Sequence, residues 1–359
     1  MREPAFTVVM PLYNHAAYVG AAIDSVLAQT FGDFELVICN DGSTDASLEV
    51  ATAYRDDRLR VINKPNGGTV TALNSCLLKS EGTFVCWLSS DDLFSPGKLQ
   101  AHHELHAAHP EAPISVAPFG YLRDGEQIAD TQVRVPDDAR LMQFVNGNYI
   151  NGLSVCAHRR VYGLYGQFDN RYRFAHDVER WFRFFKHEVP AFLTGTPLSH
   201  SRLDSSVTAD ADLLGMLDVL KILCNELQVH GLRGLLPAAP ARSPLTLDML
   251  AWMCSRLFGR SSLFARFDMR RHIVEVVATS LCREGRESLL PALMACFQRG
   301  ESDADSRLVL EHLDDVASLI HVGEPQVSLS FVEHVVRLKS TVSSAAQRDV
   351  LDRYLRIGF

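Results

Sequence analysis

Long apolar runs are missing from this 359-residue sequence. No stretch approaches the roughly 18 uncharged apolar residues of a membrane-spanning helix, and the opening residues 1–9 lack the charged and apolar regions of a secretion signal. We therefore expect a cytoplasmic protein. Excess positive charge is also missing, because the net charge is -8. Nucleic-acid binding depends on neutralising phosphates, so we expect no nucleic-acid partner.

Paired cysteines and phosphate-binding glycine motifs are missing as well. The eight cysteines are scattered without a Cys-x-x-Cys pair, and several lie in apolar runs, which indicates reduced and mostly buried thiols. No Gly-x-Gly-x-x-Gly follows the first expected strand and no P-loop sequence occurs, so dinucleotide and P-loop sites lose their main support. The composition, 47% apolar and 22% charged, is typical of a soluble globular protein.

Apolar runs of strand length alternate with segments of helical period between residues 6 and 119. The expected strands cover 6–12, 34–39, 59–63, 83–88 and 114–119, and the expected helices cover 18–30, 45–55, 69–79 and 96–109. This alternation predicts the α/β class, with a mostly parallel sheet and helices on both faces. Ligands of such sheets bind beyond the carboxyl ends of the strands. Polar loops fall at four of those ends, at residues 13–14, 40–43, 66–68 and 89–92.

The second half of the sequence has a different pattern. Residues 120–135 are extended and rich in turn residues, and they are followed by an expected short helix near 141–146, a strand at 153–158 and a helix at 176–187. From about residue 205 onward, apolar residues follow helical spacing only. We therefore predict two domains, an α/β catalytic domain over residues 1–204 and an all-α C-terminal domain over residues 205–359.

Acidic residues follow two of the apolar strands. Asp41 opens a loop in which Gly42 permits close backbone approach, and the next residues suit the start of a helix. Asp91 and Asp92 are adjacent, so they repel one another unless a cation or hydrogen-bond donors compensate them. A hard divalent cation that also binds a ligand's phosphates would meet that need. A solvated acidic turn is the alternative interpretation.

Several motifs, taken in order, resemble the family 2 glycosyltransferases of GT-A fold. The resemblance is carried by residues 8–14, 25–31 and 34–45, continues through 66–68, 72–74, 82, 87–92 and 96, and thins to scattered matches between 120 and 204. It implies a Rossmann-like GT-A domain that transfers a sugar from a nucleotide diphosphate donor with inversion. The expected enzyme is a hexosyl- or N-acetylhexosaminyltransferase of polysaccharide biosynthesis. Its expected donor is a UDP-sugar, or else a dTDP-sugar, and its acceptor is a hydroxyl of a glycan or glycoconjugate.

The resemblance also implies how the donor is held. Asp41 would accept a hydrogen bond from the imide N–H of uracil or thymine, in a pocket lined by Pro11 and Tyr13. Asp92 would contact a divalent cation, Mn²⁺ or Mg²⁺, on the diphosphate, although Ser89 stands where many relatives have an aspartate. The expected nucleotide-binding residues are Pro11, Tyr13, Asn14, Asp41, Gly68, Asn74, Asp91 and Arg202.

Asp177 matches the catalytic base of the family. A base of this kind removes the proton of the acceptor hydroxyl as its oxygen attacks the anomeric carbon. His176 replaces the glutamate that usually precedes the base. Without the resemblance, the preferred interpretation of Asp177 is a helix-start carboxylate stabilised by the helix dipole.

Two further clusters of charged or titratable residues stand out. Four histidines, at 102, 103, 106 and 109, crowd one expected helix, and we expect them to be solvated because no cysteine or carboxylate completes a zinc site. Five arginines interleave with apolar residues between 254 and 272. This pattern is typical of peripheral contact with an anionic membrane, or of a helix packed on the catalytic domain. The helical domain is also where we would expect a homo-oligomer to form.

Two other classes of function stay open. Ser89 and His176 depart from the family pattern, and such departures would fit a degenerate sugar-nucleotide-binding or assembly module without catalysis. A sugar-nucleotide nucleotidyltransferase shares the α/β layering. It would have a glycine-rich first loop with basic residues for a triphosphate, which residues 13–15 lack.

Overall fold

The computed structural model of the chain describes residues 3–131, 150–187 and 189–203, with a few positions between 215 and 291. The chain divides into two compact units, one made of residues 1–135 and 149–207 and the other of residues 136–148 and 208–359. The first unit holds nearly all of the described residues. The expected short helix near 141–146, the basic segment 254–272 and almost all of the expected helical domain lie outside the described residues, so they stay predictions.

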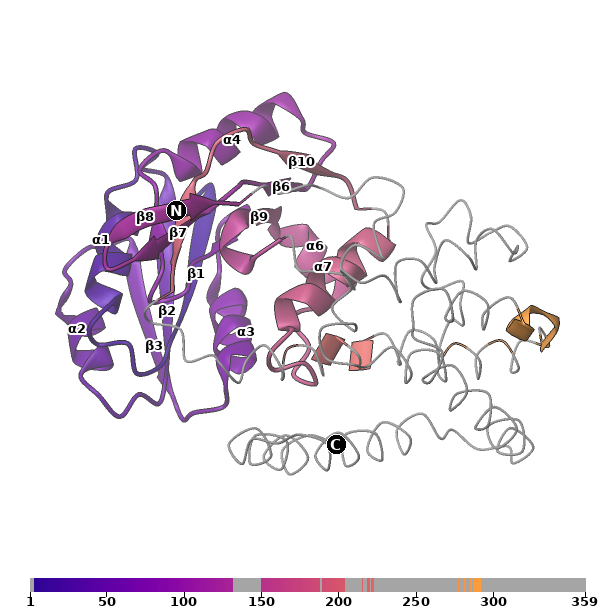
Figure 1. Cartoon of the computed structure of the whole chain (residues 1–359). Coiled ribbons are helices and arrows are strands. Elements are labelled where there is room, and N and C mark those ends of the chain that lie inside the picture. Colours follow the sequence, from indigo (N-terminus) through magenta and orange to yellow (C-terminus); the bar gives the residue numbers. More distant parts are fainter. Residues whose placement is uncertain are drawn as a thin grey trace. The chain divides into compact units, whose positions relative to one another are not determined.

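A seven-stranded sheet with the strand order β10-β6-β9-β4-β1-β2-β3 forms the centre of the first unit. Its strands are β1 (Phe6–Leu12), β2 (Phe34–Asp41), β3 (Leu59–Lys64), β4 (Phe84–Trp87), β6 (Ile114–Val116), β9 (Val155–His158) and β10 (Ala191–Leu193). Strand β9 runs antiparallel to both of its neighbours, whereas the other four pairs are parallel. The prediction of an α/β fold with a mostly parallel sheet is therefore confirmed (Figure 1).

The helices of the first unit follow the strands in the expected order. They are α1 (Val19–Leu27), α2 (Ser47–Ala53), α3 (Thr69–Lys79), α4 (Lys98–Ala108), α6 (Arg159–Tyr165) and α7 (His176–Lys186). In Figure 1, α1 and α2 lie on one side of β1, β2 and β3, and α3 lies on the other. No helix among the described residues is long and apolar enough to cross a membrane.

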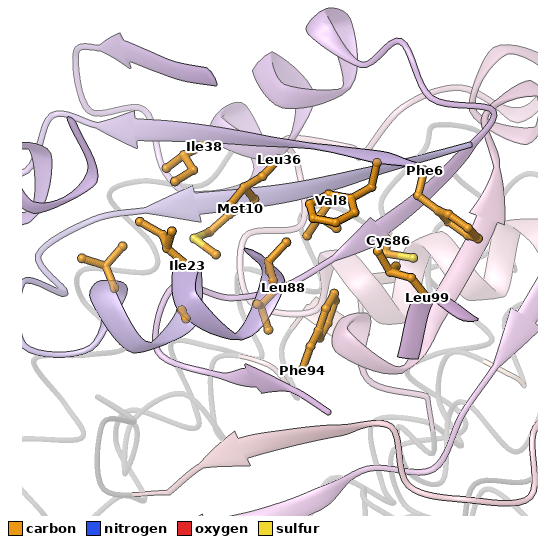
Figure 2. Close-up of a cluster of buried hydrophobic side chains, with 14 of the residues drawn as sticks. Phe6, Val8, Met10, Ile23, Leu36, Ile38, Cys86, Leu88, Phe94 and Leu99 are labelled. Carbon is orange, nitrogen blue, oxygen red and sulfur yellow. The ribbon is translucent and has the colours of Figure 1, made fainter. Parts of the chain in front are cut away.

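The apolar core lies between one face of the sheet and the helices α1 and α4. Alternate residues of β1, such as Phe6, Val8 and Met10, are fully buried in it (Figure 2). The intervening residues of the strand are buried as well, because α3 packs against β1 and β2. Strands covered on both faces are expected to be apolar throughout. This is why the strand regions were predicted well from their composition.

A second sheet, of four short strands, has the order β5-β11-β7-β8. Its strands are β5 (Leu93–Phe94), β7 (Gly120–Arg123), β8 (Glu126–Asp130) and β11 (Ser199–Arg202). Asp124 and Gly125 connect β7 to β8, and both have positive φ angles, of 52° and 82°. Such angles are typical of the two-residue turns that close β-hairpins. This sheet was expected only as an irregular extended stretch.

The expectation that the histidines of α4 are solvated is wrong for two of them. His102 is 0% exposed and His106 is 8% exposed, whereas His103 is exposed. Both buried rings lie on the face of α4 that packs against β6. The burial is tolerated because each ring finds hydrogen-bond partners, with Ser115 of β6 between the two rings. No metal-binding cluster of three or more His, Cys, Asp or Glu residues exists in the described part of the chain.

The buried histidines belong to a series of hydrogen bonds in which every donor and acceptor can be assigned. The carbonyl of Ala112 can only accept, so the Nδ1 of His106, at 3.2 Å, carries a proton. The Nε2 of neutral His106 then accepts from the hydroxyl of Ser115 at 2.9 Å, and that hydroxyl accepts from Nδ1 of His102 at 2.7 Å. The remaining Nε2 of His102 faces Nζ of the buried Lys98 at 3.3 Å. All members are satisfied only when both histidines are neutral.

Candidate active site

The carboxyl ends of β1, β2, β3 and β4 meet at one edge of the sheet, because these four strands are parallel. The loops at this edge are cross-linked. Asn14, with a φ of 52°, donates from its backbone N–H to Oγ of Ser43 at 3.0 Å, and its side-chain oxygen accepts from the backbone N–H of Thr44 at 2.8 Å. The structure therefore places Asn14 as a brace between two loops. Tyr13 beside it is 44% exposed.

Asp41 closes β2 and is almost completely buried, at 1% exposure. Its carboxylate accepts hydrogen bonds from the backbone N–H groups of Gly67 at 3.0 Å and Gly68 at 2.7 Å, and it pairs with the ammonium of Lys64. Gly68 has a φ of 87° and precedes α3. A carboxylate offers about four lone-pair sites, so one further donor, such as the imide N–H of a base, fits. Sequence reasoning missed Lys64, although a lysine at a strand end was visible.

The acidic pair follows β4. Asp92 is buried, at 5% exposure, and one of its oxygens accepts from the backbone N–H of Arg202 at 2.9 Å. Burial, together with the charge of Asp91, raises the pKa of Asp92 to about 8. His15 lies nearby, with Nδ1 2.8 Å from Oγ of Ser90. A buried carboxylate beside a second one resists ionisation unless positive charge arrives.

This electrostatic arrangement fits a divalent cation. Asp91 and Asp92 supply hard oxygen ligands, and burial together with the charge of Asp91 disfavours the ionised form of Asp92, which a nearby cation would favour. The described residues offer no third carboxylate or histidine to complete a metal cluster. A cation here would therefore need oxygens from a bound diphosphate or from water.

Arg202 ends β11, which is hydrogen-bonded to β5 and β7. Its guanidinium lies 5.7 Å from the ring centre of Tyr18. The second sheet thus brings residue 202 next to the acidic pair, as its expected role near the diphosphate requires.

Asp177 lies in the first turn of α7, where its Oδ1 accepts from the backbone N–H of Val178 at 2.8 Å. The preceding His176 donates from Nδ1 to the carbonyl of Arg173 at 3.1 Å, and its ring lies 5.4 Å from the ring of Trp87. The Nε2 of His176 is buried without a hydrogen-bond partner. Trp87 in turn packs on Gly152, where a Cβ atom would overlap the indole ring.

Two other expected nucleotide-binding residues have partners within the protein. Pro11 is buried in β1 opposite Cys39 of β2. Asn74 of α3 uses both ends of its amide on the backbone of Phe168.

The architecture is that of a GT-A α/β fold. Residues 7–164 match the family model described as Glycosyl transferase family 2. The S. aureus TarS 1-349 structure in complex with UDP superposes with a TM-score of 0.55 and 18% identity, and the match covers 86% of this chain and 91% of that one. At this identity the similarity concerns the fold.

Curated relatives agree with the family assignment. Two uncharacterized glycosyltransferases, RP339 of Rickettsia prowazekii and RT0329 of Rickettsia typhi, are each 30% identical, over 51% and 52% of this chain. The matches span 59% and 63% of those proteins, which is less than two thirds of their length. The Pasteurella multocida hyaluronan synthase is 40% identical over 101 residues, or 28% of this chain and 10% of that protein.

Proposed function

We propose that this chain is an inverting glycosyltransferase that moves a sugar from a UDP-sugar to a hydroxyl of a glycan or glycoconjugate. The observation that carries the proposal is the meeting of the Asp41 and Asp91-Asp92 loops at one sheet edge of a family 2 domain. The TarS structures, which hold UDP and UDP-GlcNAc, support uracil as the base and therefore a UDP-sugar as the donor. A dTDP-sugar is the second choice. The similarity to a hyaluronan synthase supports a glycan acceptor.

The proposed roles are those that the resemblance implies for these positions. Asp41 accepts the imide N–H of the base, Asp91 lies near the ribose, and Asp92 would hold a Mn²⁺ or Mg²⁺ ion at the diphosphate. Such an ion would offset the charge that develops on the departing nucleoside diphosphate. Asp177 removes the proton of the acceptor hydroxyl, whose oxygen attacks the anomeric carbon from the face opposite the leaving group.

The remaining expectations are retained as part of the proposal. A cytoplasmic location, peripheral membrane contact through residues 254–272 and self-association through the helical domain are predictions for later tests. Ser89, in place of an acidic residue, and His176 favour a binding module without catalysis as the second candidate. The two candidates differ in donor turnover.

The proposal is tested by incubating the protein with a panel of nucleotide sugars in the presence of Mn²⁺ or Mg²⁺. Donor hydrolysis and thermal shift are measured on the same samples. We expect a UDP-sugar to raise the melting temperature and to be consumed. A thermal shift without turnover in the presence of acceptor glycans would favour the binding module. If no donor produces a thermal shift and none is turned over, both the glycosyltransferase and the binding module are contradicted.

A further inference from the structure

Asn74, at the middle of α3, holds a segment that follows it by 94 residues. Its Nδ2 donates to the carbonyl of Phe168 at 2.9 Å, and its Oδ1 accepts from the backbone N–H of Phe168 at 3.0 Å. The amide thus donates one hydrogen bond to the backbone of Phe168 and accepts one from it, as the backbone of a paired β-strand does. Both ends of the amide are therefore engaged by the backbone of Phe168.

Arginines of α7 hold the residues just before Phe168. Arg180 donates from Nη1 to the carbonyls of Gly166 and Gln167, and Arg183 donates from Nη1 to the carbonyl of Tyr165 at 2.8 Å. These carbonyls end α6, where a helix exposes unpaired oxygens and the negative end of its dipole. Guanidinium groups match both features, and α6 and α7 lie side by side (Figure 1).

The contact made by Arg180 is buried and enclosed by aromatic rings. Arg180 is 0% exposed, and its guanidinium lies 4.4 Å from the ring centres of both Tyr162 and Phe184 and 5.1 Å from that of Phe168. Burial lowers its pKa to about 10, which leaves it charged at neutral pH. An enclosed guanidinium with fixed partners gives α7 little freedom to slide or rotate.

Asp177 lies three residues before Arg180 on the same helix, about 4.5 Å along the axis. At the start of α3, the backbone N–H groups of Gly67 and Gly68 hold Asp41. A continuous series of contacts therefore runs from Asp41 through α3, Asn74, Phe168 and Arg180 to Asp177.

We propose that Asn74 and Arg180 are positioning residues, which keep the base Asp177 at a fixed distance from the nucleotide side of the site through Phe168. The inference rests on the proposed function and deepens it. It also assigns Asn74 a role different from the nucleotide contact expected from the sequence. Transfer requires the base and the donor to be aligned, and a misplacement of about 1 Å costs on the order of 100-fold in rate.

The test compares Asn74→Ala with Ser75→Ala, a neighbouring change in α3 that leaves both bonds between Asn74 and Phe168 in place. The hydroxyl of Ser75 donates to the carbonyl of Thr71 and also has a hydrogen bond with the thiol of Cys39. We expect Asn74→Ala to lower kcat by about 10- to 100-fold, with the Kd for UDP and the KM for the donor within about twofold of the parent. Ser75→Ala should leave all three unchanged. Weakened UDP binding in Asn74→Ala, or an unchanged kcat, would overturn the proposal.

Two further measurements keep the test decisive. Hydrogen exchange of peptides over residues 165–180 should be faster in Asn74→Ala than in Ser75→Ala, and equal exchange would contradict the bridge even in an inactive protein. Arg180→Lys keeps the charge but loses the planar guanidinium that lies among the rings of Tyr162, Phe168 and Phe184, so it should repeat the loss of kcat with UDP binding retained. If the parent neither binds UDP nor turns over any donor, the proposed function fails, and the exchange result alone decides the bridge.

Discussion

The backbone N–H of Arg202 donates a hydrogen bond of 2.9 Å to the buried carboxylate of Asp92, which lies 110 residues earlier in the chain. This bond fixes one oxygen of Asp92, and the side chain of Ser201 in the same strand also donates a hydrogen bond to the carboxylate. The short strand β11 is therefore part of the acidic site, although nothing in its own sequence is acidic.

Replacement of Asp92 with Asn tests the role of the cation. The amide oxygen can still accept from Arg202, and Asn resembles the protonated carboxyl that a pKa of about 8 favours near neutral pH, so the melting temperature should stay unchanged or rise. Turnover should fall by at least about 100-fold, and excess chelator should abolish the activity of the parent. Activity that persists at full rate in EDTA would remove the cation from the mechanism.

Loss of Asp41 should weaken nucleotide binding. The carboxylate would lose a charged hydrogen bond to the base, so we expect Asp41→Ala to reduce UDP affinity by about 1.5 to 3 kcal/mol by calorimetry. Because the same carboxylate holds Gly67, Gly68 and Lys64, the melting temperature should also fall. Glu49→Ala, an exposed change in α2, serves as the charge control. Equal UDP affinity in Asp41→Ala and the parent would refute the assignment.

Asp177→Asn should separate binding from chemistry. The amide can still accept from the backbone of Val178, so α7 should keep its start. Loss of a general base lowers the rate by about 10² to 10⁴, while UDP binding should match that of the parent. NMR of the product should show an inverted anomeric configuration. A retained anomeric configuration would contradict the assignment of Asp177 as the base of an inverting transfer, even if the variant were slow.

The histidines of α4 should make the protein less stable in mild acid. Burial, followed by the charges of His158 and His103, lowers the pKa of His106 to about 4, against the ordinary 6.5, and burial also lowers the pKa of His102 well below its ordinary value. Between pH 6.5 and 4 these two rings bind more protons in the unfolded chain than in the folded one. Their contribution to the free energy of unfolding should therefore be fully present above pH 6.5 and fall as the pH decreases toward 4, whereas Asp92, whose pKa is raised to about 8, contributes the opposite slope.

Urea unfolding between pH 4.5 and 7.5 measures this effect. Ser115→Ala, which removes the hydroxyl between the two rings, should lower the free energy of unfolding by about 1 to 3 kcal/mol at neutral pH. Ala107→Gln, an uncharged change at an exposed position of the same helix, should leave both the slope and the value unchanged. The profile of Asp92→Asn, which lacks the opposing contribution of Asp92, isolates the effect of the rings, and a flat profile of that variant would mean that the buried rings are not neutral in the folded state.

The parts of the fold and site that sequence predicted are those with local signals. The fully apolar run of β1 and the helical period of α3 fixed these elements to within a residue, and the acidic residues after β2 and β4 indicated the functional edge. The ends of other elements were less accurate. The expected strand 114–119 stops at Val116, one residue before Ala117-Pro118.

Other features depend on contacts between distant residues, which leave no local pattern. The pairing of Asn74 with Phe168, the burial of Arg180 among aromatic rings and the partners of His102 arise only when the chain is folded. A hydrophilic helix face with four histidines is indistinguishable in sequence from a solvated one. The hairpin at Asp124-Gly125 is an exception, because this dipeptide is a strong hairpin signal that the sequence did contain.

Position 152 has room for one hydrogen atom and nothing larger. The indole of Trp87 occupies the space in which any other residue would carry its first side-chain carbon. The indole also lies against the ring of His176, so it cannot move aside without displacing the residue next to Asp177. A library randomised at this codon and selected for function should return glycine alone. Even alanine, the smallest substitution, would displace the indole of Trp87 and then the ring of His176, and so would shift Asp177.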